Sequence, residues 1–249
     1  AAALAQRMQE GFEKLLYNPA MGFIDSSIEA DTYEQRSVPS NNAVKWENNF
    51  CGELIAAHAR DYLAFYEKHL VSPAGLRPLP EWHECYDIDA NQLHCWWPVM
   101  SELYIRLINR FDRPDLMKQY IGWIEYWSQR LTCPEGISCY DNVKEVPFDP
   151  WNCLCGIWHG YSIRGFYNAV VHGFVGVDFD QEGFHIYPYS GEEVSLTGLH
   201  FGERTFDITV KGSGPTVTHV KINGQDFGAV TTIPLVVFEL QNTVEIVRG

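Results

Sequence analysis

The sequence predicts a mixed α+β protein, with a helical domain over residues 1–174 and a small antiparallel β-sandwich-like domain over residues 175–249. In the first part, apolar residues recur every three or four positions, which is the period of an amphipathic helix. In the second part they alternate with polar residues, which is the period of a strand with one buried face. The pair Asn223-Gly224 is typical of the tight turn of a β-hairpin.

Five stripes of apolar residues predict five helices in the first part, since each stripe repeats at steps of three and four residues. They run over about residues 4–15, 46–69, 97–111, 114–131 and 155–171. Pro114 follows a break in the pattern and suits the first turn of the fourth helix. The chain begins within the first stripe, so we expect residue 1 to lie inside a longer protein.

Three long connections separate these helices, over residues 17–41, 71–95 and 132–152. Each of them is crowded with polar and aromatic side chains. Long ordered loops in a compact helical domain are more often functional than idle. The sequence therefore places most candidate site residues in or beside these loops.

Strands are expected wherever the second part alternates between apolar and polar residues. The alternating residues are Phe206, Ile208 and Val210; Thr218, Val220 and Ile222; Val236, Phe238 and Leu240; and Val244 and Ile246. Turn signals separate several of these runs, so we expect them to pair as an antiparallel sheet.

The composition narrows the range of partners. The net charge is −14, from 32 acidic against 18 basic residues. A protein this acidic repels phosphate backbones and anionic lipids, so we expect no nucleic-acid partner and no membrane association. Aromatic residues make up 14%, with 8 Trp. Such rings serve either as core or as flat surfaces on which sugar rings stack.

The chain has seven cysteines, and their spacing fits neither a disulfide framework nor a standard zinc site. We therefore expect buried reduced cysteines, no metal and no cofactor. Reduced cysteines favour a reducing compartment. Residues 1–7 lack the layout of a signal peptide, but a periplasmic or secreted location stays open if further residues precede them.

Three motifs follow one another in a fixed order: residues 72–79 (S-P-A-G-L-R-P-L), Tyr86 with residues 96–98 (W-W-P), and residues 176–188 (G-V-D-F-D-Q-E-G-F-H-I-Y-P). They resemble three segments of glycosidases and sugar phosphorylases that are built on an (α/α)6 toroid. Those segments read T-P-x-G-L-R-x-L, Y…G-x-x-W-P-W and G-[IV]-x-x-D-x-x-G-[LF]-x-[IF]-x-P. Ser72 stands for the usual Thr, and the glycine of the second motif is absent. The resemblance covers about residues 41–249.

The resemblance implies that the helical domain is part of an (α/α) toroid. A complete toroid of this kind has twelve helices, whereas the sequence predicts five, so the chain looks like the C-terminal portion of such an enzyme. The implied function is a carbohydrate-active enzyme, a glycoside hydrolase that acts on an oligosaccharide or polysaccharide. The expected protein partner is the remainder of a longer chain or a second copy of this one.

Glycoside hydrolysis by inversion needs two carboxyl groups, one that protonates the leaving group and one that activates water. The families resembled place the base in a position where this chain has Ser138 or Cys139. Asp141 and Glu145 are the nearby carboxylates that could replace it; alternatively, they are exposed loop acids. Glu84 lies in an acidic cluster, in which adjacent carboxylates raise one another's pKa or are simply solvated.

Six further residues are candidates for substrate contact, because their side chains donate hydrogen bonds to hydroxyl groups or stack on sugar rings. They are Arg77, Tyr86, His94, Trp97, Trp158 and His159. His159 has an equally good interpretation as a histidine of the core.

Three alternatives stay open. A sugar phosphorylase would have almost the same sequence features, with phosphate in place of water. A polysaccharide lyase also combines a toroid with a β-sheet domain, and Arg77, Tyr86, Asn91 and His94 could serve its chemistry. A non-catalytic sugar-binding fragment accounts for the imperfect base loop.

Overall fold

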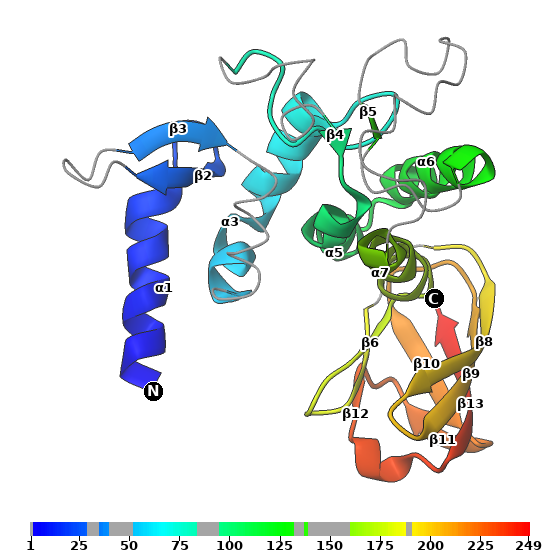
Figure 1. The fold of residues 1–249 in the computed structure, drawn as a ribbon. Coiled ribbons are helices and arrows are strands. Elements are labelled where there is room, and N and C mark those ends of the chain that lie inside the picture. The colour runs from blue at the N-terminus through cyan, green and yellow to red at the C-terminus, as the bar shows by residue number, and fades with distance from the viewer. Residues whose placement is uncertain are drawn as a thin grey trace. The chain divides into compact units, whose positions relative to one another are not determined.

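The computed structural model describes residues 2–28, 35–39, 52–83, 95–131, 137–138, 160–187 and 191–249 (Figure 1). The chain forms two compact units. The first comprises Ala1–Leu107 and Gly122–Phe166, and the second comprises Ile108–Ile121 and Tyr167–Gly249. The mixed α+β class is confirmed, whereas the division of domains after residue 174 stays a prediction.

The helices follow the predicted stripes closely. They are α1 (Ala2–Leu16), α3 (Gly52–Phe65), α5 (Glu102–Arg110), α6 (Pro114–Leu131) and α7 (Gly160–Asn168). Two end in π-helical segments, namely η1 (Tyr66–Leu70) after α3 and η4 (Ala169–Val175) after α7. A 3-10 turn, η2 (Pro98–Ser101), precedes α5. Pro114 begins α6, as its fixed φ and missing N–H predict.

The connection over residues 17–41 is not a plain loop, contrary to prediction. It contains β1 (Tyr17–Asn18), β2 (Phe23–Ile28) and β3 (Gln35–Pro39), which pair antiparallel in that order. The Asn18 side chain closes the first turn by accepting a hydrogen bond from the backbone of Ala20 at 3.1 Å. The residues of β2 (F-I-D-S-S-I) and β3 (Q-R-S-V-P) do not alternate between apolar and polar, so their sequence carries no strand signal.

The second unit holds a five-stranded sheet in the order β11-β10-β13-β9-β8. Its strands are β8 (Val194–Phe201), β9 (Arg204–Lys211), β10 (Val217–Ile222), β11 (Gln225–Gly228) and β13 (Gln241–Arg248). The predicted all-antiparallel pairing is wrong at one place, because β13 runs parallel to β9. The chain between β11 and β13 returns to insert β13 between β9 and β10, and this return sets its direction.

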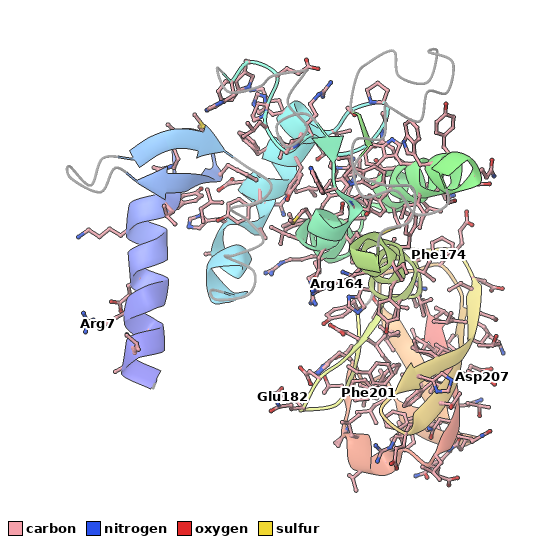
Figure 2. The ribbon with its side chains drawn as sticks, viewed as in Figure 1. Arg7, Arg164, Phe174, Glu182, Phe201 and Asp207 are labelled. Atoms are coloured by element: carbon pink, nitrogen blue, oxygen red, sulfur yellow. The ribbon has the colours of Figure 1, made fainter. Side chains whose placement is uncertain are left out.

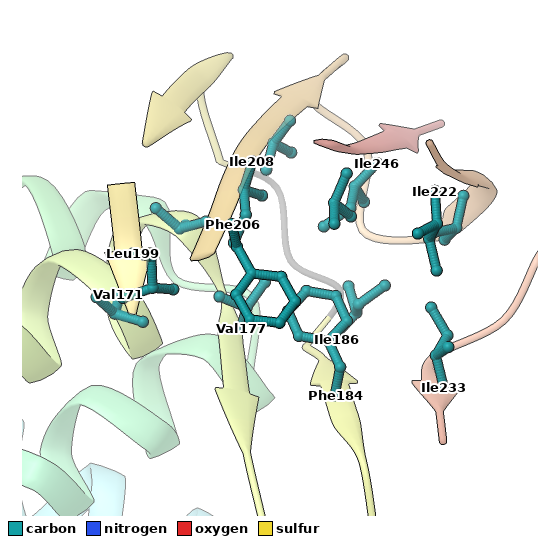
Figure 3. Close-up of a cluster of buried hydrophobic side chains, with 14 of the residues drawn as sticks. Val171, Val177, Phe184, Ile186, Leu199, Phe206, Ile208, Ile222, Ile233 and Ile246 are labelled. Atoms are coloured by element: carbon teal, nitrogen blue, oxygen red, sulfur yellow. The ribbon is translucent and has the colours of Figure 1, made fainter. Parts of the chain in front are cut away.

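A second sheet of the same unit has the order β12-β7-β6. Its strands are β6 (Val177–Phe179), β7 (Phe184–Ile186) and β12 (Thr232–Ile233). One hydrophobic cluster contains residues of both sheets, and Figure 3 shows Phe184, Phe206 and Ile246 within it. The predicted inward residues Phe206, Ile208 and Val210 are all buried.

The strand predicted over residues 236–240 is absent. The chain instead forms a 3-10 turn, η5 (Leu235–Val237), and Val236 is 87% exposed. The backbone N–H of Val237 donates to the carbonyl of Pro234 at 3.1 Å, which closes this turn. Phe238 alone is buried, and its ring lies 5.2 Å from that of Phe206. The backbone N–H of Thr205 in β9 also donates to the carbonyl of Leu240 at 2.8 Å, so the Phe238 ring and this hydrogen bond hold the segment without a regular strand.

The hairpin at Asn223-Gly224 is confirmed. Both residues have positive φ, +50° and +83°, as the primed hairpin turns require. The turn joins β10 to β11 through the pair Ile222 and Gln225.

None of the described helices combines the length and apolar character that crossing a membrane requires.

Candidate functional site

Two of the predicted site residues, Arg77 and Trp97, fall within the part of the chain that the structure describes. The others lie outside the described residues; they are Glu84, Tyr86, His94, Asp141, Glu145, Trp158 and His159. The candidate site is therefore built from the loop that carries Arg77 and from what packs against it.

The loop of the first motif is closed by its own serine. The Ser72 hydroxyl donates to the carbonyl of Gly75 at 2.8 Å and accepts from the backbone N–H groups of Ala74 and Gly75 at 3.2 and 3.1 Å. Val71 and Leu76 pair across the base of the loop. These contacts use only a hydroxyl group, so Ser72 can fill the place at which the resembled motif has Thr.

The first and second motifs are in contact. A Cβ atom on Gly75 would lie 2.6 Å from Cδ2 of the buried Trp96 ring, so the indole packs directly on the glycine backbone. Trp96 Nε1 donates to Ser101 Oγ at 2.8 Å, which fixes the ring. From α6, Trp127 Nε1 donates to the carbonyl of Ala74 at 2.9 Å. The first two motifs, which follow one another in the sequence, thus pack against each other in the first unit.

Arg77 is buried and binds within its own loop. Its guanidinium donates to the carbonyl of Val71 at 2.9 Å and forms an ion pair with Glu81 at 2.5 Å. Its backbone N–H donates to the carbonyl of Leu70 at 2.7 Å. Arg77 therefore joins the two ends of the loop, and contact with a sugar stays a prediction for it.

Trp97 is half-buried and stands just before η2. Its backbone is extended, with φ −108° and ψ 103°, as expected for a residue that precedes proline. The carbonyl of Trp97 accepts a hydrogen bond from the backbone of Met100 at 2.8 Å, which starts the 3-10 turn. Its predicted stacking on a sugar ring stays a prediction.

One exposed aromatic residue close to Arg77 in the sequence is not among the predicted site residues. Trp82 is 54% exposed, and its Nε1 donates to Nδ1 of His69 at 3.1 Å. Burial of His69, and the neighbouring Lys68 charge, hold the pKa of that imidazole below its usual value. A neutral His69 can accept this hydrogen bond, whereas an imidazolium cannot. The residue type alone does not tell an exposed tryptophan from a buried one, since the same large apolar side chain occurs in both places.

The third motif closes the hairpin between β6 and β7 in the second unit. Gly176, with φ +76°, ends η4 in the left-handed conformation, and its N–H donates to the carbonyl of Val171 at 3.0 Å. A Cβ on Gly183 would collide with the carbonyl of Ile233. In Figure 2, Glu182 is labelled at the tip of this hairpin. The motif therefore has a structural use in strand pairing.

Asp180 and His185 hold the hairpin turn together. One carboxylate oxygen of Asp180 accepts from the backbone N–H groups of Glu182 and Gly183 at 2.7 and 3.1 Å and lies 2.7 Å from His185 Nε2. The other ring nitrogen of His185 lies 3.2 Å from the hydroxyl of Thr232 in β12. This arrangement has the composition of an Asp-His-Thr relay, but every bond in it stabilises local backbone or strand pairing.

We predict that Asp180 makes the hairpin sensitive to acid. The hydrogen bond from His185, and then those from the backbone, lower the pKa of Asp180. A carboxyl group whose pKa is lower in the folded state contributes stability above its unfolded pKa, and that contribution disappears as the pH falls through the folded value. Thermal unfolding between about pH 5 and about pH 2 should therefore show a steeper loss of stability for the natural protein than for Asp180→Asn.

Glu182→Gln is the matched control, because it removes an exposed acid from the same turn. Its pH profile should follow that of the natural protein. Parallel profiles for the natural protein and Asp180→Asn would contradict the assignment.

A second polar cluster lies at the end of η4. His172 Nε2 lies 3.3 Å from a carboxylate oxygen of Asp178, and the ring of Tyr167 meets the His172 ring edge-on at 5.8 Å. Burial, and then the Asp178 charge, raise the pKa of Tyr167. Among the described residues, no group of three or more His, Cys, Asp or Glu side chains could hold a metal ion.

Comparisons with known proteins gave matches among solved structures and none among family models or curated proteins. Among solved structures, the chain is similar to a family GH92 alpha-mannosidase from Bacteroides thetaiotaomicron and to the same enzyme in complex with mannoimidazole. Both have a TM-score of 0.38 and 11% sequence identity. The alignments cover 94% and 95% of this chain but 29% and 31% of the mannosidase, so the chain spans less than a third of its length.

Proposed function

We propose that this chain is part of a carbohydrate-active enzyme, a glycoside hydrolase that acts on an oligosaccharide or polysaccharide. The observation that carries the proposal is the contact between Gly75 and Trp96, which joins two of the motifs that resemble toroid glycosidases. A chance likeness in two separate loops gives no reason for the loops to touch, whereas a shared architecture does. On this proposal the helical domain over residues 1–174 is a portion of an (α/α)6 toroid.

The proposed chemistry is inversion by two carboxyl groups, one that protonates the glycosidic oxygen and one that activates a water molecule. Asp141 is the proposed base, with Glu145 as its substitute, and Glu84 is the proposed acid. Substrate contact is proposed for the six residues predicted from the sequence, namely Arg77, Tyr86, His94, Trp97, Trp158 and His159. The ion pair between Arg77 and Glu81 shows that this loop carries charged groups, and such groups can form hydrogen bonds with sugar hydroxyl groups.

The test is the release of reducing ends from a panel of neutral oligosaccharides by the longest version of the protein that expresses in folded form. Asp141→Asn and Glu84→Gln should each lower kcat by about 10²–10⁴-fold, the usual contribution of a general acid or base. Glu203→Gln, at the exposed turn between β8 and β9, is the control and should leave kcat unchanged. The product formed first should have the opposite anomeric configuration to the substrate, which NMR measures directly.

The other outcomes identify the alternatives. An unsaturated uronate among the products would favour a lyase, and a requirement for phosphate would favour a phosphorylase. Full activity in the Asp141 variant would remove that residue as the base. One observation favours a non-catalytic sugar-binding fragment, since Ser138 or Cys139 stands where the resembled families have their base. Binding of oligosaccharide without any turnover would support that fragment.

A further inference from the structure

We infer that Trp82 is a platform on which one sugar ring of the bound carbohydrate stacks, and that His69 holds the indole in position for it. This inference rests on the proposed function, because it names a subsite for the same substrate class. Neither residue belongs to the motifs that resemble toroid glycosidases.

The first support is the exposure of an anchored aromatic ring. Most tryptophan side chains are highly buried, since the indole ring has a large apolar surface. Trp82 has 54% of its surface exposed, yet its Nε1 donates to His69 at 3.1 Å and the two rings meet edge-on at 82°. A ring that moved freely in water would have no such partner.

The anchor continues into the core of the first unit. The ring of His69 lies 4.8 Å from that of Phe65 in α3, and Phe65 in turn stacks on Phe23 at 4.2 Å. Phe65 and Phe23 are both buried. Because each ring fixes the next, Trp82 loses little conformational freedom when a ligand covers it, and this lowers the entropic cost of binding.

The second support is a charged acceptor beside the ring. The backbone N–H of His83 donates to the carbonyl of Pro80 at 3.0 Å, so Glu81 and Trp82 are the two central residues of a hydrogen-bonded turn. Pro80 and His83 are buried, whereas Glu81 and Trp82 are exposed. The Glu81 carboxylate, 51% exposed, is held by Arg77.

This pair of exposed groups matches the two surfaces of a pyranose. The C–H groups of one sugar face pack on an aromatic ring, and the hydroxyl groups at its edge donate to a carboxylate. An apolar peptide would have no use for the carboxylate, and a uronate would be repelled by it. The preferred ligand is therefore a neutral hexose unit of a glycan.

The test labels the protein with 5-fluorotryptophan, which places one ¹⁹F reporter on each of the 8 Trp residues. The spectrum of Trp82→Phe assigns the Trp82 resonance by its disappearance. Titration with the panel of neutral hexose oligosaccharides should shift that resonance in the natural protein. In binding measurements, Trp82→Ala should weaken the affinity by about tenfold, whereas Trp82→Phe, which keeps a ring, should weaken it less.

His69 is tested as a positioning residue. His69→Ala should weaken binding, and His69→Gln, which can still accept the indole hydrogen bond, should restore most of the affinity. Leu240→Ala removes an exposed apolar side chain in the second unit and serves as the control, with unchanged affinity. The Trp82 and Leu240 variants should unfold at the temperature of the natural protein, because both side chains are exposed.

The measurements distinguish failure of the Trp82 platform from failure of the proposed function. Shifts of other tryptophan resonances without the Trp82 resonance, or equal affinity in Trp82→Ala, would overturn the platform and leave the proposed function standing. Absence of binding and cleavage for every oligosaccharide would overturn both.

Discussion

Replacing Gly75 by alanine is expected to lower the free energy of unfolding by about 1–3 kcal/mol, which is the usual cost of overpacking a rigid core site. The new Cβ would lie 2.6 Å from Cδ2 of Trp96. That indole cannot easily move aside, because it is buried, donates to Ser101 and lies 5.8 Å from the ring of Trp123. Either the loop or the indole must shift, and the contact between the two motifs is lost.

Urea unfolding followed by tryptophan fluorescence measures this effect well. None of the 8 Trp residues lies within the second unit, so the signal comes from residues of the first. Gly122→Ala is the matched control, since nothing lies within 4 Å of a Cβ at this helical position. It should stabilise α6 by about 0.5–1 kcal/mol. Equal stability of Gly75→Ala and the natural protein would contradict the packing of Gly75 on Trp96.

If the proposed function holds, Gly75→Ala has a second expected effect. The loop that Gly75 closes also carries Arg77 and Trp82, so a displaced loop should raise KM for the oligosaccharide. Gly122→Ala should leave KM unchanged. A loss of stability without any change in KM would show that the contact between Gly75 and Trp96 stabilises the protein but does not position the proposed binding surface.

Replacing Phe206 by alanine is expected to have the largest effect on the second unit, about 3–5 kcal/mol, as is usual for an aromatic residue deleted from a core. Phe206 is fully buried in β9, and its ring lies 4.8 Å from that of Phe179 and 5.2 Å from that of Phe238. The cavity would therefore open between a sheet strand, the hairpin of the third motif and the segment after η5.

Amide hydrogen exchange in β9 and β13 is the appropriate measurement, because it reports on this sheet without a tryptophan probe. Val236→Ala is the control: this side chain is 87% exposed, so its removal should change stability by less than about 0.5 kcal/mol. Similar exchange rates in the two variants would show that the aromatic cluster does not stabilise the sheet.

The helices and the hairpin could be predicted because their signals are local. The stripe that begins at Leu116 and the proline at position 114 define α6 without any knowledge of its neighbours. Asn223 tolerates a positive φ and Gly224 adopts one freely because it has no Cβ atom. In each case, the physical cause lies within a few residues of the effect.

Three features could not be predicted because their causes are remote in the sequence. The parallel pairing of β13 with β9 depends on the path taken by the intervening chain. Val236 and Leu240 show a strand's alternation, but Phe238 alone found a place in the core. Among site residues, Arg77 was predicted as a sugar ligand from its type, whereas its hydrogen bond to Val71 depends on how the loop closes.

Local periodicity and turn chemistry therefore decided the α+β class, the helix positions and the Asn223-Gly224 turn, since these depend on the backbone preferences of neighbouring residues. Tertiary structure alone decided that the first motif packs on Trp96, that Asp180 and His185 stabilise a hairpin, and that Trp82 remains exposed while anchored by His69. Those contacts join residues on different elements or opposite sides of a turn, and their energy exists only once the chain has brought them within bonding distance.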